Sequence, residues 1–134
     1  MQTSERRTAL RSPKDIVVAR EYARELGSLL GMSSIGATEL ATAISEVARN
    51  ALTYGGGGEV VLSQFAEAKR RGIRVTVEDK GPGIADIDLA MKDGYSTGES
   101  LGLGLPGARR LVDKFEIVSK VGMGTRVTMT KWAS

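Results

Sequence analysis

The chain has 134 residues, of which 41% are hydrophobic and 26% charged, a composition typical of one soluble globular domain spanning 1–134. It contains no cysteine and no histidine, which excludes disulfides, thiolate or imidazole metal ligands, and Ser-His-Asp or Cys-His nucleophile pairs. The net charge of +3 is scattered and aromatic residues make up only 4%, so we expect no nucleic-acid binding. No apolar run is long enough to span a membrane, and the polar start lacks the apolar core of a signal peptide. We therefore expect no membrane association and a cytoplasmic location.

The first predicted helix follows a polar N-terminal segment and begins at a recognisable capping pattern. Residues 1–11 are polar, and we expect them to be either flexible or a short edge strand. Ser12, Pro13 and Asp15 form a helix-start pattern, with a capping residue, a proline in the first turn and an acid facing the cap. Apolar residues then recur at helical spacing until Gly31, a natural helix terminator.

A second helix is predicted over residues 34–54. Its apolar residues form one arc, and its polar residues, among them Glu46 and Asn50, fall on the opposite face. The four glycines at 55–58 end this helix and lead into the next strand.

The second half of the chain is richer in strand patterns. Residues 60–65 and 73–77 predict a hairpin. A short helix over 86–92 and a third long helix over 105–115 follow, and the segments FEIVSKV and GTRVTMTKW predict a closing hairpin. Three helices and at least four strands in this order predict an α+β fold, with helices on one face of a mixed, mainly antiparallel sheet.

The segment GLGLPG at 102–107 matches a dinucleotide-binding pattern, but we reject that interpretation. No apolar strand precedes it, and no acid lies about 20 residues later to bind a ribose. Glycines that open a helix still expose backbone N–H groups to an anion. The segment is therefore either a phosphate cradle or a tight loop with ordinary caps.

Two further patterns carry alternative interpretations. Asp79, which precedes Gly81-Pro82-Gly83, is either a turn residue or a carboxylate that accepts a hydrogen bond from an amino group such as that of adenine. Glu46 and Asn50 lie one helical turn apart, so they are either a solvated face or a site for Mg²⁺ and proton transfer.

The three patterns in this order resemble the GHKL ATP-binding family, which includes histidine-kinase catalytic domains, gyrase, Hsp90 and MutL. The resemblance rests on Glu-x-x-x-Asn in a helix, Asp-x-Gly-x-Gly after a strand, Gly-x-Gly-x opening a helix, and Gly124-Thr125 in the last hairpin. It covers residues 35–132 and implies the Bergerat fold, a two-layer α/β sandwich. It also implies ATP and Mg²⁺ as cofactors.

The resemblance also implies roles for individual residues. Asn50 would ligate Mg²⁺, and Glu46 would act as the catalytic base or hold a metal-bound water. Residues 84–101 would form the lid over ATP, and Arg109 or Arg110 would add charge near the γ-phosphate. The phosphates would bind the backbone of Gly102, Leu103, Gly104 and Leu105.

On the nucleobase side, Asp79 would bind the adenine amino group, with Thr125 supporting it through water. Gly81 and Gly83 would shape the adenine wall. Val47 departs from the alanine common in the family, and we expect this change to affect packing only.

Within the family, a chain of this size is similar to the freestanding partner-switching serine kinases. The absence of a histidine near Tyr54, the Pro106-Gly107 pair, Phe115 and the final Lys-Trp favour the stressosome switch kinases of the RsbT type. That resemblance implies a protein-serine/threonine kinase that phosphorylates STAS-domain proteins and, when released, activates a PP2C-type phosphatase in the general stress response. The alternatives are an anti-sigma factor kinase that sequesters a sigma factor, and an ATP-binding module without transfer activity.

Overall fold

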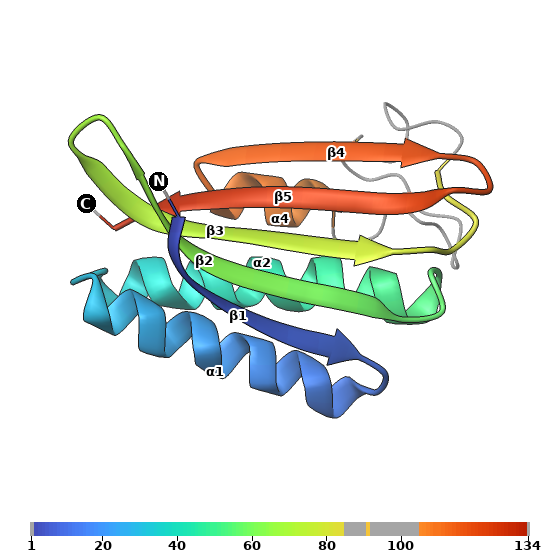
Figure 1. Cartoon of the computed structure of the whole chain (residues 1–134), viewed down its shortest axis with the longest axis horizontal. Helices are drawn as coiled ribbons and strands as arrows, with labels where there is room; N and C mark the ends of the chain where they lie inside the picture. Colours follow the sequence, from blue (N-terminus) through green and yellow to red (C-terminus); the bar gives the residue numbers. More distant parts are fainter. Residues whose placement is uncertain (1, 85–90, 92–104, 134) are drawn as a thin grey trace.

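The computed structural model of the chain describes residues 2–84, 91 and 105–133. Its strands form one five-stranded sheet in the order β1-β2-β3-β5-β4, and all four neighbouring pairs are antiparallel (Figure 1). The elements are β1 (Gln2–Leu10), α1 (Pro13–Leu29), α2 (Ser34–Thr53), β2 (Gly58–Glu67), β3 (Arg70–Asp79), α4 (Leu105–Leu111), β4 (Lys114–Lys120) and β5 (Gly124–Trp132).

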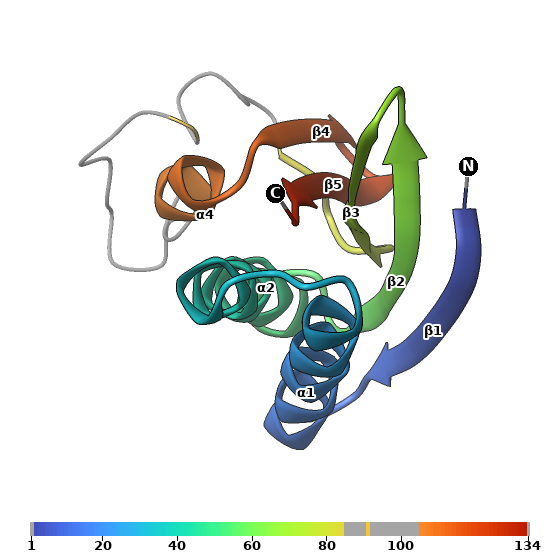
Figure 2. The same cartoon turned by 90° about the vertical axis from the view of Figure 1, so that its left-hand side faces the viewer.

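The described helices all cover the same face of the sheet. Figure 2 shows α1, α2 and α4 on one side and the curved sheet on the other. Because side chains alternate along a strand, each strand sends every second residue toward the helices. The central strands contribute buried Val60, Leu62, Val75, Val77 and Met129 to this core. The predicted α+β fold with helices on one sheet face is therefore confirmed.

The predicted signals at both helix starts are present. The Asp15 carboxylate accepts hydrogen bonds from the backbone N–H groups of Arg11 (2.8 Å) and Ser12 (3.0 Å) at the start of α1. Ser12 and Asp15 together form a capping box at this helix start. At the start of α2, the Ser33 hydroxyl accepts from the backbone N–H of Gly36 at 3.0 Å.

The N-terminal segment is a full edge strand. Residues 2–10 form β1, which pairs with residues 58–65 of β2 and has one register shift between Gln2 and Glu5. This agrees with the edge strand predicted as one alternative and makes it longer than expected. The polar character of the segment suits an edge, where one face and one side of the strand meet water.

The third helix is shorter than the sequence predicts. It ends at Leu111, and Phe115 lies in β4 opposite Met129. Phe115 and Ile117 alternate on the inner face of that strand, so the same apolar residue fits a helical spacing and a strand spacing, and pairing with β5 decides between them. The prediction of a helix reaching residue 115 is therefore wrong.

The short helix predicted over 86–92 lies outside the described residues, apart from the buried Met91. Within the described part of the chain, no helix is both long enough and apolar enough to cross a membrane.

Candidate nucleotide-binding site

A pocket lies between α2, the end of β3, the start of β5 and the start of α4. Five of the predicted site residues line it: Asn50, Asp79, Gly83, Leu105 and Thr125. They come from five separate segments of the chain, so the fold brings together residues that the sequence only places in order. The remaining lining residues are Val47, Ala51, Tyr54, Gly55, Val77, Pro82, Ile84 and Val127.

Asp79 faces this pocket because strand alternation puts it on the helix side of the sheet. It is the last residue of β3, and it lies opposite Thr125 of β5. Its carboxylate accepts a hydrogen bond from the backbone N–H of Gly81 at 2.8 Å. Partial burial raises the pKa of Asp79, while backbone hydrogen bonds from Gly81 and Thr125 oppose that shift. The result is an acceptor that the backbone holds in one position.

Gly55 gives the Asp79 side chain its space. A Cβ at Gly55 would overlap the Asp79 carboxyl group and would lie 2.7 Å from the Asp79 Cβ. Gly81 approaches from the other side, where a Cβ would lie 2.5 Å from the Cα of Gly55. The two glycines therefore bring the end of α2 and the turn after β3 into backbone contact around the carboxylate.

The turn between β4 and β5 supports the opposite wall of the pocket. The backbone N–H of Gly122 donates to the carbonyl oxygen of Pro82 at 2.8 Å. Gly83 has a φ of +78°, and a Cβ there would collide with the carbonyl oxygen of Lys120. The segment after Asp79 is therefore held against this turn rather than projecting into solvent.

Ser119 connects this wall to Thr125. The Ser119 hydroxyl lies 2.7 Å from the Thr125 hydroxyl, accepts from the backbone N–H of Ile84 at 2.7 Å and donates to the carbonyl oxygen of Gly124 at 3.1 Å. Ser119 faces the helix side of β4, directly opposite Thr125 in the strand register.

Glu46 and Asn50 lie one turn apart in α2, as predicted. Asn50 lines the pocket, whereas Glu46 is not among its lining residues and forms an ion pair with Arg49 at 3.1 Å. The Glu46 side chain is 35% exposed and the Arg49 side chain is 60% exposed. Because solvent screens their charges, this ion pair is weak and easily broken.

Leu105 is the first residue of α4 and is 2% exposed, so it fixes the start of the helix against the core beside the pocket. The predicted phosphate-binding residues Gly102, Leu103 and Gly104 lie outside the described residues. Arg109 and Arg110 are exposed in the last turn of α4 and do not line the pocket.

A Mg²⁺ ion would find few protein ligands here. No group of three or more acidic residues is close enough to form a metal site among residues 2–84, 91 and 105–133. The amide oxygen of Asn50 and the carboxylate of Glu46 are hard oxygen donors, and Mg²⁺ usually takes only one or two such ligands with substrate phosphates and water. These residues fit a metal that arrives with a nucleotide.

Sequence reasoning missed three features of the pocket. Gly55 is interpreted there only as a helix terminator, and Ser119 is not singled out. Val47 is expected to affect packing only, yet it lines the pocket. Val47 belongs to the regular apolar pattern of α2, and this pattern does not indicate which of its residues face a cavity. The roles of Gly55 and Ser119 depend on contacts between segments that are distant in the sequence.

Comparisons with known proteins agree with this geometry. The family of histidine kinase-, DNA gyrase B- and HSP90-like ATPases matches residues 36–133. The chain is 43% identical over 118 residues to serine/threonine-protein kinase RsbT of Bacillus subtilis (strain 168), covering 88% of this chain and 89% of that protein. It is 33% identical over 98 residues to the anti-sigma F factor of Clostridium kluyveri, covering 70% and 69%.

Among solved structures, the mycobacterial sensor histidine kinase MprB superposes with a TM-score of 0.58. The match covers 96% of this chain and 97% of that chain at 15% identity, so it is a likeness of fold. The family match over residues 36–133 and the 43% identity to RsbT confirm the family resemblance that the ordered motifs predict.

Proposed function

Because this chain belongs to the family of histidine kinase-, DNA gyrase B- and HSP90-like ATPases, we propose that it is an ATP- and Mg²⁺-dependent protein-serine/threonine kinase. The observation that carries this proposal is the convergence of Asn50, Asp79 and Thr125 on one pocket. Its similarity to a serine/threonine-protein kinase over 88% of its length supports protein phosphorylation rather than nucleotide hydrolysis alone.

The nucleobase end of the pocket would lie at Asp79. A carboxylate held by backbone N–H groups is a fixed acceptor, which suits the exocyclic amino group of adenine. Gly55 and Gly83 contribute backbone without side chains to the pocket lining, and Val77 and Val127 supply apolar contacts for a flat ring. This combination of apolar walls and a few fixed polar groups is typical of a small-molecule site.

The phosphate end would lie toward Asn50 and the start of α4. Asn50 would hold the Mg²⁺ ion, and the backbone N–H groups of Gly102, Leu103, Gly104 and Leu105 would bind phosphate oxygens. Bound Mg²⁺ would neutralise the charge that develops on the transferred phosphoryl group.

Glu46 is the residue we assign to proton transfer. It lies one turn before Asn50 on the same face of α2, and its exposed ion pair with Arg49 leaves the carboxylate open to a substrate. In this position Glu46 would accept the proton of the attacking serine or threonine hydroxyl.

We further propose that the protein substrate is a STAS-domain protein, and that the released kinase binds and activates a PP2C-type phosphatase. The support is the similarity to RsbT together with anti-sigma factors, whose match extends over 70% of the chain. One protein would then exchange between a substrate scaffold and a downstream phosphatase.

The test is incubation of the protein with labelled ATP, Mg²⁺ and a cognate STAS-domain protein, followed by mass spectrometry of the STAS protein. We expect phosphate on serine or threonine, and loss of transfer with Glu46→Gln. A matched control is Glu21→Gln, which changes an exposed acid of α1 and should leave transfer intact. Absence of transfer by the wild-type protein, or full transfer by Glu46→Gln, would contradict the assignment.

A second candidate function is sequestration of a sigma factor, which the similarity to anti-sigma F factors favours. The two functions predict different partners. A pull-down from cells that recovers a sigma subunit, and neither a STAS-domain protein nor a phosphatase, would decide for this alternative.

A further inference from the structure

Ser119 is a polar residue beside the pocket that none of the proposed nucleotide contacts uses. Its hydroxyl contacts three groups at once: the Ile84 backbone N–H, the Gly124 carbonyl oxygen and the Thr125 hydroxyl. The side chain is half-buried, and β4 places it on the helix side of the sheet. The three contacts fix its orientation.

The number of protons determines the direction of each hydrogen bond. A serine hydroxyl has one proton to donate and two lone pairs to accept with. The Ile84 N–H can only donate and the Gly124 carbonyl oxygen can only accept, so all three contacts are hydrogen bonds only when the single Ser119 proton goes to Gly124. Either hydroxyl can donate across the 2.7 Å contact between Ser119 and Thr125, and the arrangement that keeps all three hydrogen bonds is the one in which Thr125 donates to Ser119.

The consequence lies on the pocket side of Thr125. With its proton committed to Ser119, the Thr125 hydroxyl has only lone pairs left for a ligand. Asp79, opposite Thr125 in the strand register, also presents an acceptor. Both polar side chains at this end of the pocket therefore accept hydrogen bonds.

We propose that Ser119 is a positioning residue that fixes Thr125 as an acceptor, and that it thereby selects purines with a 6-amino group over purines with a 6-oxo group. This inference rests on the proposed nucleotide-binding function and adds its base specificity. An amino group supplies donors to the two acceptors, whereas a carbonyl oxygen faces them with a third acceptor. A buried site with hydrogen-bonding groups left unpaired discriminates strongly against the wrong ligand.

The experiment compares ATP with inosine triphosphate, in which a carbonyl oxygen replaces the 6-amino group and N1 carries a proton. Dissociation constants of both nucleotides with Mg²⁺ are measured by titration calorimetry for the wild-type protein and for Ser119→Ala. Removal of the Ser119 hydroxyl frees Thr125 to rotate and to donate into the pocket. We expect the preference for ATP to fall by about tenfold, the change that one hydrogen bond of ordinary strength produces.

A matched control is Thr128→Val, which removes a hydroxyl from β5 on the opposite face of the sheet. It should leave the preference unchanged. A second variant, Thr125→Val, removes the hydroxyl that Ser119 orients, so adding Ser119→Ala to it should cause no further change in preference. A remaining effect in that background would show that Ser119 acts by another route and would overturn the proposal.

The outcomes separate the two claims. If the wild-type protein binds ATP and Ser119→Ala weakens both nucleotides equally, Ser119 has a structural role only and the inference is wrong. If the wild-type protein binds neither nucleotide, the proposed function fails and the inference fails with it. Circular dichroism of each variant confirms that the compared proteins are folded.

Discussion

Glu78 and Asp79 are adjacent acids at the end of one strand, and the sheet gives them opposite environments. Glu78 points to the helix-free face, where its side chain is 52% exposed and lies 3.9 Å from Arg126. Asp79 points to the helix side, where its partners are backbone N–H groups and its pKa is raised by burial. Strand alternation alone separates a solvated ion pair from a fixed hydrogen-bond acceptor.

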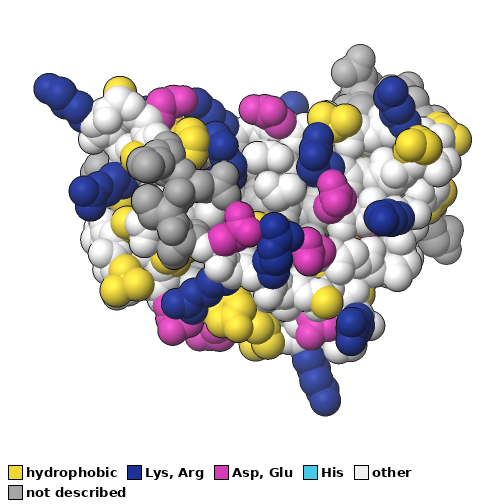
Figure 3. All heavy atoms as spheres, in the orientation of Figure 1, with side chains coloured by type: hydrophobic (Ala, Val, Ile, Leu, Met, Phe, Trp, Pro, Cys, Tyr) yellow, Lys and Arg dark blue, Asp and Glu magenta, His cyan; other side chains and the backbone are white. Residues whose placement is uncertain are grey.

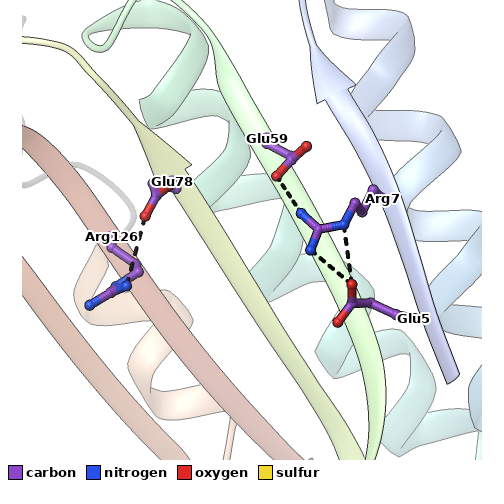
Figure 4. A network of polar contacts seen from close by, with 5 residues as sticks. All are labelled: Glu5, Arg7, Glu59, Glu78 and Arg126. Atoms are coloured by element: carbon purple, nitrogen blue, oxygen red, sulfur yellow. Dashed lines mark hydrogen bonds and ion pairs between the residues drawn. The ribbon is translucent and has the colours of Figure 1, made fainter. Parts of the chain in front are cut away.

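Other acids on the helix-free face also form exposed ion pairs with arginines, as Glu78 does. Figure 4 shows Arg7 between Glu5 and Glu59, with Glu78 and Arg126 on the neighbouring strands. Figure 3 shows side chains of both charges mixed across this face. Such pairs contribute little because water and salt screen them. On the helix side, Asp79 is instead held by backbone N–H groups.

The largest effect is expected from Gly55→Ala, which places a methyl group in the space that the Asp79 side chain occupies. The added Cβ would displace the carboxylate from its backbone donors, since it would overlap the carboxyl group. We expect a loss of about 1 to 3 kcal/mol in the free energy of unfolding, typical of overpacking. We also expect nucleotide affinity to fall about 100-fold, because a charge-assisted hydrogen bond is lost. Denaturant unfolding and titration calorimetry measure the two changes.

The control for this variant is Gly56→Ala. Gly56 has a φ of +74°, but nothing lies within 4 Å of a Cβ placed there. It should lose about 1 kcal/mol from backbone strain alone and keep its nucleotide affinity. Equal affinity losses in the two variants would show that Gly55 has no special relation to Asp79.

Asp79→Asn sharpens the comparison by separating stability from binding. Because burial raises the folded-state pKa of Asp79, the charged form costs stability above that pKa, and the cost disappears as the pH falls through it. We therefore expect Asp79→Asn to have a higher thermal midpoint than the wild-type protein at pH 7, and this gain to shrink in acid. Glu78→Gln should change the midpoint little at either pH. Calorimetric scans between pH 4 and 7 measure this, and a gain that grows in acid would contradict it.

Lys131 and Lys114 provide a comparison of two lysines at equal distance. Each lies 3.0 Å from a glutamate, but the Lys131 side chain is 14% exposed and that of Lys114 is 45% exposed. Lys131 also donates to the carbonyl oxygen of Leu111 at the end of α4. We expect Lys131→Met to cost about 1 to 2 kcal/mol and Lys114→Met less than about 0.5 kcal/mol in unfolding free energy. Similar costs for both would mean that burial does not distinguish them.

The smallest effect is expected from Arg7→Ala on the helix-free face. The Arg7 side chain is 58% exposed, and both of its acidic partners are exposed as well. We expect a small decrease in thermal midpoint at low salt that disappears at about 1 M salt, where the screening length is about 3 Å. A decrease that persists at high salt would show that Arg7 stabilises the sheet by packing.

The sequence predicts the elements well where periodicity and end signals agree. The helix over 34–54 and the hairpin of β2 and β3 follow from local patterns, and the structure confirms them. The same reasoning gives the wrong element for Phe115, because this residue fits both the helical spacing and the strand spacing of apolar residues. The order of motifs predicts that Asn50, Asp79 and Thr125 belong to one site. It does not predict the roles of Gly55 and Ser119, because those depend on which backbone atoms from distant segments approach them.

The central claim is that the pocket at Asp79 binds ATP, and titration of ATP with Mg²⁺ into the wild-type protein and Asp79→Asn tests it most directly. The account predicts saturable binding at one site by the wild-type protein and an affinity about 100-fold lower for Asp79→Asn, with both proteins equally folded. Equal affinity of the two proteins, or no binding by the wild-type protein, would contradict it.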